Sequence, residues 1–130
     1  MSGKKRILMV DDDREFVAAT RMLLETNGFE FSSANDGASG IEAARRVKPD
    51  LIILDVMMTT ETEGIDVSRK LRETPEMKKT PVIMLTSIRR AMNLPFAFEP
   101  DPDLLPVTAV LEKPVASARL LEEIHKLLGA

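Results

Sequence analysis

The stretch from Asp50 to Asp55, DLIILD, constrains the fold more than any other part of the chain. It contains four consecutive apolar residues and ends abruptly on a carboxylate. A run this short and this apolar is typical of a strand in a parallel sheet, where helices cover both faces. Asp55 would stand at the carboxyl end of that strand. Ligands of open α/β sheets bind outside these carboxyl ends, so the position of Asp55 indicates a functional site.

Other segments also have the composition of strands, and most of them end on polar side chains. The segment 4–10 (KKRILMV) is followed by a run of aspartates, 80–87 (TPVIMLTS) ends on hydroxyl groups, and 107–114 (VTAVLEKP) ends on a lysine and a proline. The segment 29–34 alternates only weakly and is predicted to be a short strand. Together with the stretch described above, these segments predict a sheet of five strands.

Helical patterns separate the predicted strands. Residues 14–28 carry apolar side chains at helical spacing, with Asp13 as candidate N-cap and Gly28 as the stop. The stripe of this helix consists of Phe16, Thr20, Leu23 and Leu24. The other predicted helices are 38–47, 64–73 and 116–128. Because alternating strands and helices build right-handed βαβ units, we predict an α/β fold with one parallel sheet.

The segment 93–106 departs from this alternation. Pro95, Pro100, Pro102 and Pro106 all fall within it. Helix interiors do not tolerate proline at this density, because proline lacks the N–H donor and clashes with the preceding turn. We therefore expect an irregular segment here in place of most of the helix that would follow residues 80–87.

Composition limits the class of protein. The chain of 130 residues fits one domain, 1–130, large enough to bury roughly two-thirds of its unfolded surface. No run approaches the roughly 18 apolar residues of a membrane span, so we expect no membrane role. The net charge of −3 lacks the basic surface of a nucleic-acid binder. Without cysteine there is no disulfide framework, and a cytoplasmic setting is the simplest expectation.

Each polar strand end has a structural explanation when it is taken alone. Acids before a helix often cap it and complement its dipole, and every strand has to end on some residue. This explanation does not account for the polar strand ends taken together. Several strands of one parallel sheet would end at the same edge, in acidic, hydroxyl and lysine side chains whose chemistry is complementary. We therefore expect one site, formed by Asp11, Asp12, Asp55, Thr86 and Lys113.

The chemistry that fits this set is phosphoryl transfer to a carboxylate. Clustered carboxylates stay ionised only if a cation compensates them, and hard oxygen ligands suit Mg²⁺. We expect Asp11, Asp12 and Asp55 to hold that ion. Asp55 is the predicted nucleophile and would form an acyl phosphate. Lys113 and the Thr86 hydroxyl would contact the remaining phosphoryl oxygens.

The order of these motifs resembles the receiver domain of bacterial two-component response regulators. The matching segments are ILMVDDD, LIILDVMM, VIMLTS and LEKPV, which extend over essentially the whole chain. The resemblance implies a flavodoxin-like three-layer sandwich with a five-stranded sheet of order 2-1-3-4-5. It implies that Asp55 is the phosphoacceptor and that the backbone carbonyl of Met57 is a further metal ligand.

The same resemblance implies partners. A histidine kinase or a histidine phosphotransfer protein would phosphorylate the chain, and a downstream protein target or output domain would read the resulting conformational change. The chain would then be a stand-alone, chemotaxis-regulator-like protein or a part of a longer one.

The chain departs from the family pattern in three places. After Asp55 the family usually reads D-x-M-M-P-x-M-D-G, whereas this chain reads DVMMTTETEG, so Thr59 replaces the proline and Gly64 comes one residue late. The family usually has an aromatic residue three positions before the lysine, and here that residue is Val110. The third departure is the proline-rich segment. These departures concern the switch and the output face, and they leave the phosphorylation residues intact.

Two other functions share part of the pattern. Haloacid-dehalogenase-like phosphatases also form an aspartyl phosphate, on an aspartate that follows a strand. They need a later acidic metal-binding motif as well, and the segment after Lys113 offers only Glu122 and Glu123 for it. A pseudo-receiver would be a pure interaction module. The intact acids, hydroxyl and lysine argue against it, while Thr59 and Val110 argue weakly for it. We expect a signalling domain rather than an enzyme, and we expect His125 to be a surface residue.

Overall fold

The computed structural model describes residues 4–55, 63–75, 77–87, 107–113 and 115–129. Its sheet has five parallel strands in the order β2-β1-β3-β4-β5, which confirms the predicted topology. The strands are β1 (Arg6–Val10), β2 (Glu30–Ala34), β3 (Leu51–Asp55), β4 (Val82–Ser87) and β5 (Ala109–Lys113). The helices within these described ranges are α1 (Arg14–Thr26), α2 (Gly37–Val47), α3 (Glu63–Glu73) and α5 (Ser117–Leu128).

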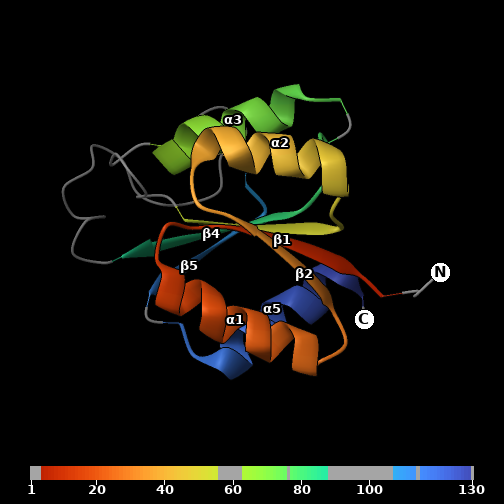
Figure 1. Ribbon diagram of the computed structural model, residues 1–130. Coiled ribbons are helices and arrows are strands. Elements are labelled where there is room, and N and C mark those ends of the chain that lie inside the picture. The colour runs from red at the N-terminus through yellow and green to blue at the C-terminus, as the bar shows by residue number, and fades with distance from the viewer. Residues whose placement is uncertain (1–3, 56–62, 76, 88–106, 114, 130) are drawn as a thin grey trace.

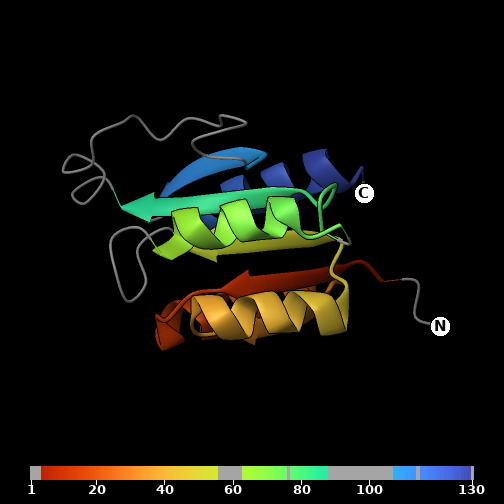
Figure 2. The ribbon, with the colours of Figure 1, turned by 90° about the horizontal axis from the view of Figure 1, so that it is seen from above.

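Helices cover both faces of the sheet and so make three layers (Figure 1). The α2 and α3 helices run side by side over one face (Figure 2), and α1 and α5 cover the other. Successive side chains of a strand point to opposite faces. In β3, Ile52 and Leu54 therefore pack beneath α2 and α3, while Leu51 and Ile53 pack against α1 and α5. All four side chains are fully buried, as the sequence predicts.

Aspartates begin the first two helices. Asp13 is the N-cap of α1, as predicted, and its Oδ1 accepts a hydrogen bond from the Phe16 N–H at 3.1 Å. Asp36 caps α2, and its Oδ1 accepts hydrogen bonds from the backbone N–H of Ser39 at 2.8 Å and from the Ser39 hydroxyl at 2.7 Å. These bonds favour the ionised carboxylate and lower the pKa of Asp36. Gly28, with φ of 88°, ends the first helical segment as expected.

The boundaries of several elements differ from the predicted ones by one or two residues. The β1 strand begins at Arg6 rather than at residue 4, β4 at Val82 rather than at residue 80, and β5 at Ala109 rather than at residue 107. Thr108 links the starts of β4 and β5. Its Oγ1 accepts a hydrogen bond from the Val82 N–H at 3.1 Å, and its own N–H donates to the Val82 carbonyl at 2.8 Å.

The helix boundaries shift by similar amounts. The α2 and α3 helices each begin one residue before the predicted start, and α5 begins at Ser117 rather than at residue 116. In α2 the reason is that the capping residue, Asp36, comes directly before the helix. The proline-rich segment 93–106 and Thr59 lie outside the described residues. None of the described helices has both the length and the apolar character needed to cross a bilayer.

Candidate functional site

Four neighbouring strands carry the predicted site residues at their carboxyl ends. Asp11 directly follows β1, Asp55 is the last residue of β3, Thr86 lies next to the end of β4, and Lys113 is the last residue of β5. Because all these strands are parallel, their carboxyl ends share one edge of the sheet. The structure therefore brings together four residues that are far apart in the sequence. Met57 lies outside the described residues.

Three carboxylates meet at this edge. One oxygen from each of Asp11, Asp12 and Asp55 lies within 4.8 Å of the other two. The Asp11 side chain has no exposed surface and that of Asp55 is 8% exposed, whereas Asp12 is exposed. Asp13 belongs to the same acidic run, but its side chain caps α1. Two of the three carboxylates, those of Asp11 and Asp55, are thus buried, and the cluster is open to solvent at Asp12.

Lys113 connects two of these carboxylates. Its Nζ lies 2.9 Å from Asp11 Oδ2 and 3.7 Å from Asp55 Oδ2. The other oxygen of Asp11, Oδ1, accepts a hydrogen bond from the Asp13 N–H at 2.9 Å. A buried charge is tolerated when such partners satisfy it. Lys113 therefore compensates part of the negative charge and, together with the Asp13 backbone, fixes the orientation of Asp11.

Thr86 contributes a buried hydroxyl at the same edge. The residue is 2% exposed, and within the described part of the chain its Oγ1 has no hydrogen-bond partner. Buried polar atoms of native proteins are nearly always paired, so this hydroxyl is suited to donate to an oxygen of a ligand. Three clustered carboxylates and an unpaired hydroxyl fit the binding of Mg²⁺ together with a phosphoryl group.

The acids of α5 do not join this cluster. Glu123 is buried, and its Oε1 accepts a hydrogen bond from Arg119 Nη2 at 3.1 Å. Glu122 is exposed on the same helix. His125 is exposed as predicted, and its ring centroid lies 5.8 Å from that of Phe29, the residue before β2. The later acidic motif that a phosphatase would need is therefore not found at α5.

Phe16 also lies in this region, although the sequence does not predict it as a site residue. Lys113 Nζ lies over the Phe16 ring, 4.6 Å from its centroid. Spacing along α1 identifies Phe16 only as part of the apolar stripe. No signal in the sequence distinguishes an aromatic residue that packs on the core from one that also touches the lysine of β5.

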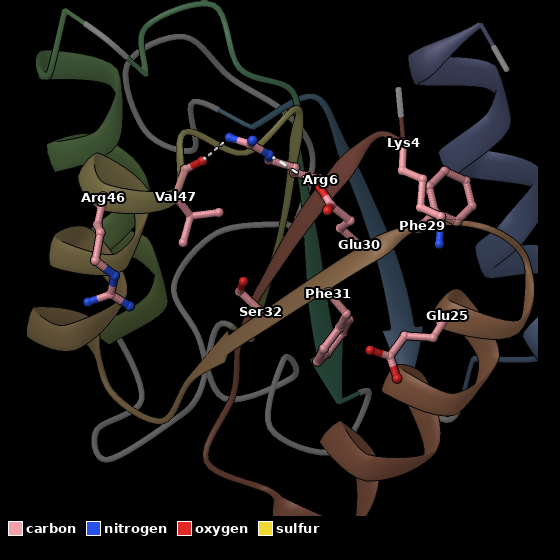
Figure 3. Close-up of a pocket in the computed structure, with 9 residues that line it drawn as sticks. All are labelled: Lys4, Arg6, Glu25, Phe29, Glu30, Phe31, Ser32, Arg46 and Val47. Atoms are coloured by element: carbon pink, nitrogen blue, oxygen red, sulfur yellow. Dashed lines mark hydrogen bonds and ion pairs between the residues drawn. The ribbon is translucent and has the colours of Figure 1, made fainter. Parts of the chain in front are cut away.

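Cavities lie near both ends of β2. One cavity of about 470 Å³ adjoins the carboxylates and is lined by Asp11 and by two arginines of α1, Arg14 and Arg21, among others. Another, of about 460 Å³, lies at the opposite end of the strands, next to the last turns of α1 and α2 (Figure 3). There Arg6 donates to the Val47 carbonyl. The second cavity contains none of the predicted site residues.

Comparisons with known proteins agree with this geometry. The family model of the response regulator receiver domain matches residues 7–125. The response regulator MprA of Mycobacterium leprae is 36% identical over 123 residues, which are 95% of this chain and 50% of that protein. The polar-differentiation response regulator DivK of Brucella anthropi is 28% identical over 128 residues, which are 96% of this chain and 97% of that protein. The chain thus spans about half of MprA and nearly all of DivK.

Solved structures share the fold. The chemotaxis protein CheY4 of Vibrio cholerae has a TM-score of 0.79 and 26% identity, covering 97% of this chain and 100% of that one. The receiver domain of the sensor histidine kinase PA1611 of Pseudomonas aeruginosa, solved with a magnesium ion in its active site cleft, has a TM-score of 0.81 and 21% identity, covering 98% and 100%. The likeness to PA1611 shows the fold alone.

These likenesses confirm the flavodoxin-like architecture with strand order 2-1-3-4-5. The acidic cluster of Asp11, Asp12 and Asp55 fits the phosphoacceptor site of such domains. Since the family model covers residues 7–125 of the 130, the chain belongs to the family of response regulator receiver domains.

Proposed function

We propose that Asp55 accepts a phosphoryl group from a histidine kinase or a histidine phosphotransfer protein, with Mg²⁺ bound, and that the acyl phosphate changes which protein the domain binds. The observation that carries this proposal is the position of Asp55. It ends a strand that is buried on both faces, beside two further carboxylates and the ammonium group of Lys113.

The family supplies the setting. Receiver domains are signalling domains that interact with histidine kinases and downstream effectors, and they bind Mg²⁺ at their acidic site. For this chain we propose a receiver domain extending over residues 1–130, a cytoplasmic location, a protein rather than a nucleic acid as partner, and no turnover of an external substrate. The net charge of −3 supports the choice of partner.

The chemical step is an in-line displacement at phosphorus. A carboxylate oxygen of Asp55 attacks, an O–P bond forms, and the bond from phosphorus to the donor breaks. The donor leaves with the electron pair of that bond. A phosphohistidine that carries a proton on its other ring nitrogen leaves as neutral histidine, and acetyl phosphate leaves as acetate. Catalysis of such a step comes from positioning and from neutralising the charge on the transferred group.

Asp11, Asp12 and Asp55, together with the carbonyl of Met57, are the residues that would hold Mg²⁺. When bound, this ion would neutralise negative charge on the phosphoryl oxygens. The donor set supports this assignment, because hard carboxylate oxygens are the preferred ligands of Mg²⁺ and Asp12 is accessible from solvent.

Lys113 and Thr86 would receive the transferred group. The Lys113 ammonium is 3.7 Å from an oxygen of Asp55, so a short movement would allow it to donate to a phosphoryl oxygen on that carboxylate. The Thr86 hydroxyl would donate to another. Its lack of a partner within the described residues supports this role, because the new bond would satisfy a buried polar atom.

Intact-mass spectrometry after incubation with acetyl phosphate and Mg²⁺ tests the proposal. We expect a gain of one phosphoryl group per chain, which chelation of Mg²⁺ prevents and which Asp55→Asn abolishes. Asp13→Asn is the matched control. It removes the same charge from the same edge, and asparagine caps a helix as well as aspartate does, so phosphorylation should persist. Equal labelling of Asp55→Asn and the parent protein would rule out Asp55 as the acceptor.

A further inference from the structure

The contact between Phe16 and Lys113 has no role in the mechanism described above. Lys113 Nζ lies 4.6 Å from the centroid of the Phe16 ring and over its face. An ammonium group within about 6 Å of an aromatic face is attracted by the negative potential of the ring. Phe16 stands in the first turn of α1, whereas Lys113 ends β5, so the tertiary fold creates the contact.

Within the described part of the chain, the Lys113 ammonium therefore has three neighbours with different properties. Asp11 Oδ2, at 2.9 Å, and Asp55 Oδ2, at 3.7 Å, are anionic. Both carboxylates would change during the proposed reaction, because one would take up a metal ion and the other also a phosphoryl group. The Phe16 ring is neutral and chemically inert, so its attraction for the cation stays the same in every state.

We propose that Phe16 is a positioning residue, which holds the ammonium group of Lys113 beside Asp55 through the face of its ring. The inference rests on the proposed phosphorylation of Asp55 and adds the group that orients the lysine for it. Phe16 would act only through Lys113 and would not touch the phosphoryl group.

A neutral ring is better suited to this task than a carboxylate. Lysine carries its charge on a flexible four-carbon chain, and fixing that chain reduces its conformational freedom. A carboxylate could hold the ammonium group, but it would compete with the phosphoryl oxygens for the same donors. The ring attracts the charge without accepting a strong hydrogen bond. The limited exposure of the Lys113 side chain, 21%, strengthens the attraction by keeping water away.

Graded fluorination of the Phe16 ring tests this role. Phenylalanine with one, two or five ring fluorines is placed at position 16 by codon suppression, and the rate of phosphorylation by acetyl phosphate with Mg²⁺ is followed by intact mass. Each fluorine weakens the negative potential of the ring face while the shape of the ring changes little. We expect the rate to fall step by step, by about 3- to 10-fold for the pentafluoro ring.

The matched control is Phe31, which has a similar contact away from Lys113. Arg21 Cζ lies 5.3 Å from the centroid of the Phe31 ring. The same series of fluorinated residues at position 31 should leave the phosphorylation rate unchanged. A fall at position 31 equal to that at position 16 would mean that fluorination acts through general destabilisation, and the proposal would be wrong.

A second readout does not depend on phosphorylation. Protons close to the face of an aromatic ring are shifted upfield in NMR spectra. The ε-methylene protons of Lys113 should therefore resonate upfield of those of exposed lysines, and the shift should be lost in Phe16→Leu. It should shrink in the pentafluoro protein, in which the ammonium group is no longer attracted to the ring.

The two proposals fail in different ways. If the parent protein takes up no phosphoryl group, the proposed function is wrong, and the Lys113 resonances still test the contact. If the parent protein is phosphorylated but the rate is the same for all fluorinated rings at position 16, the positioning role of Phe16 is wrong and the proposed function stands.

Discussion

The two ends of the sheet carry charges in contrasting environments. At the carboxyl end, Lys113 pairs at 2.9 Å with an Asp11 side chain that has no exposed surface. At the amino end, Arg6 Nε lies 3.3 Å from Glu30 Oε2, and the two side chains are 55% and 45% exposed. Figure 3 shows the second pair beside the cavity at the start of β2. The same kind of ion pair thus occurs buried at one end and in water at the other.

The difference in burial separates a structural role from a functional one. An exposed pair contributes roughly 0 to 1 kcal/mol, because water already solvates both charges. Removing charges from water costs several kcal/mol per ion, and a well-packed apolar replacement is often as stable. The acids and the lysine at the carboxyl end are therefore not explained by folding stability alone. Their position at the edge of the sheet where ligands bind indicates a role in the proposed phosphoryl transfer.

Removing the partly buried ammonium group of Lys113 should have the largest effect on the free energy of unfolding. Lys113→Met leaves Asp11 and Asp55 without their compensating charge, and breaking such a buried pair costs about 3 kcal/mol of unfolding free energy. Saturating Mg²⁺ should restore part of the loss, because a bound cation again compensates the acids. Urea denaturation with and without Mg²⁺ measures both quantities.

The exposed Lys126 provides the control for this prediction. It lies on α5, and Lys126→Met should change stability by no more than about 0.5 kcal/mol. If Lys113→Met cost no more unfolding free energy than Lys126→Met, the Lys113 charge would not compensate buried acids, and the proposed difference between the two ends of the sheet would be wrong.

Added bulk next to β1, the strand that precedes Asp11, should have the second largest effect on the free energy of unfolding. A Cβ at Gly40 of α2 would lie 2.9 Å from both γ carbons of Val10, which is 1% exposed and precedes Asp11. Overpacking costs about 1 to 3 kcal/mol, while alanine gains about 1 kcal/mol over glycine in a helix. We expect a net loss of about 1 kcal/mol for Gly40→Ala in urea denaturation.

A compensating substitution separates crowding from other causes. With Val10→Ala in the background, the space around position 40 increases, and Gly40→Ala should then cost less than it does in the parent protein. An equal cost in both backgrounds would show that the contact with Val10 is not the reason.

At the amino end we expect a small effect. Glu30→Gln keeps the shape of the side chain and removes only its charge. A double-mutant cycle with Arg6→Met should give a coupling energy below about 1 kcal/mol that decreases further with added salt. A coupling of 3 kcal/mol would place this exposed pair in the same class as the buried one.

The smallest effect that we predict concerns the cap of α2 and appears only in acid. The hydrogen bonds from Ser39 hold the pKa of Asp36 below the ordinary value of 3.8. The ionised cap therefore stabilises the fold fully above that value, and this contribution is lost as the pH falls through the lower, folded-state pKa. In Asp36→Asn the asparagine still caps the helix but has no carboxyl group to titrate. The melting temperature of this variant should therefore decline less below pH 3.8 than that of the parent protein. Parallel declines would contradict the shifted pKa.

The sequence predicts the parts of this molecule that depend on local rules. The apolar run before Asp55, the cap at Asp13 and the stop at Gly28 each follow from a pattern of a few residues, and the structure confirms all three. The grouping of the candidate site residues could be predicted because parallel strands end at one edge of the sheet, so residues at the strand ends are neighbours in space.

Contacts made by packing could not be predicted in this way. Nothing in the sequence indicates that Phe16 lies under Lys113, or that Gly40 must be small because Val10 is there. The hydrogen bond from the Val82 N–H to the Thr108 hydroxyl is equally invisible in the sequence. Each of these depends on how a helix or strand is seated on another. Val110, which replaces the aromatic residue usual at this position of the family, is half-buried in β5.

Identifying the phosphorylated residue by chemical trapping most directly tests the central claim, that Asp55 is the Mg²⁺-dependent phosphoacceptor. Borohydride reduces an acyl phosphate of aspartate to homoserine, and the modified residue can then be identified by peptide mass spectrometry. After treatment with acetyl phosphate and Mg²⁺, we predict homoserine at position 55 and none at positions 11, 12 and 13, with no conversion when Mg²⁺ is chelated. Homoserine at one of the other three positions, or conversion that is independent of Mg²⁺, would contradict the assignment of Asp55 as the metal-dependent acceptor.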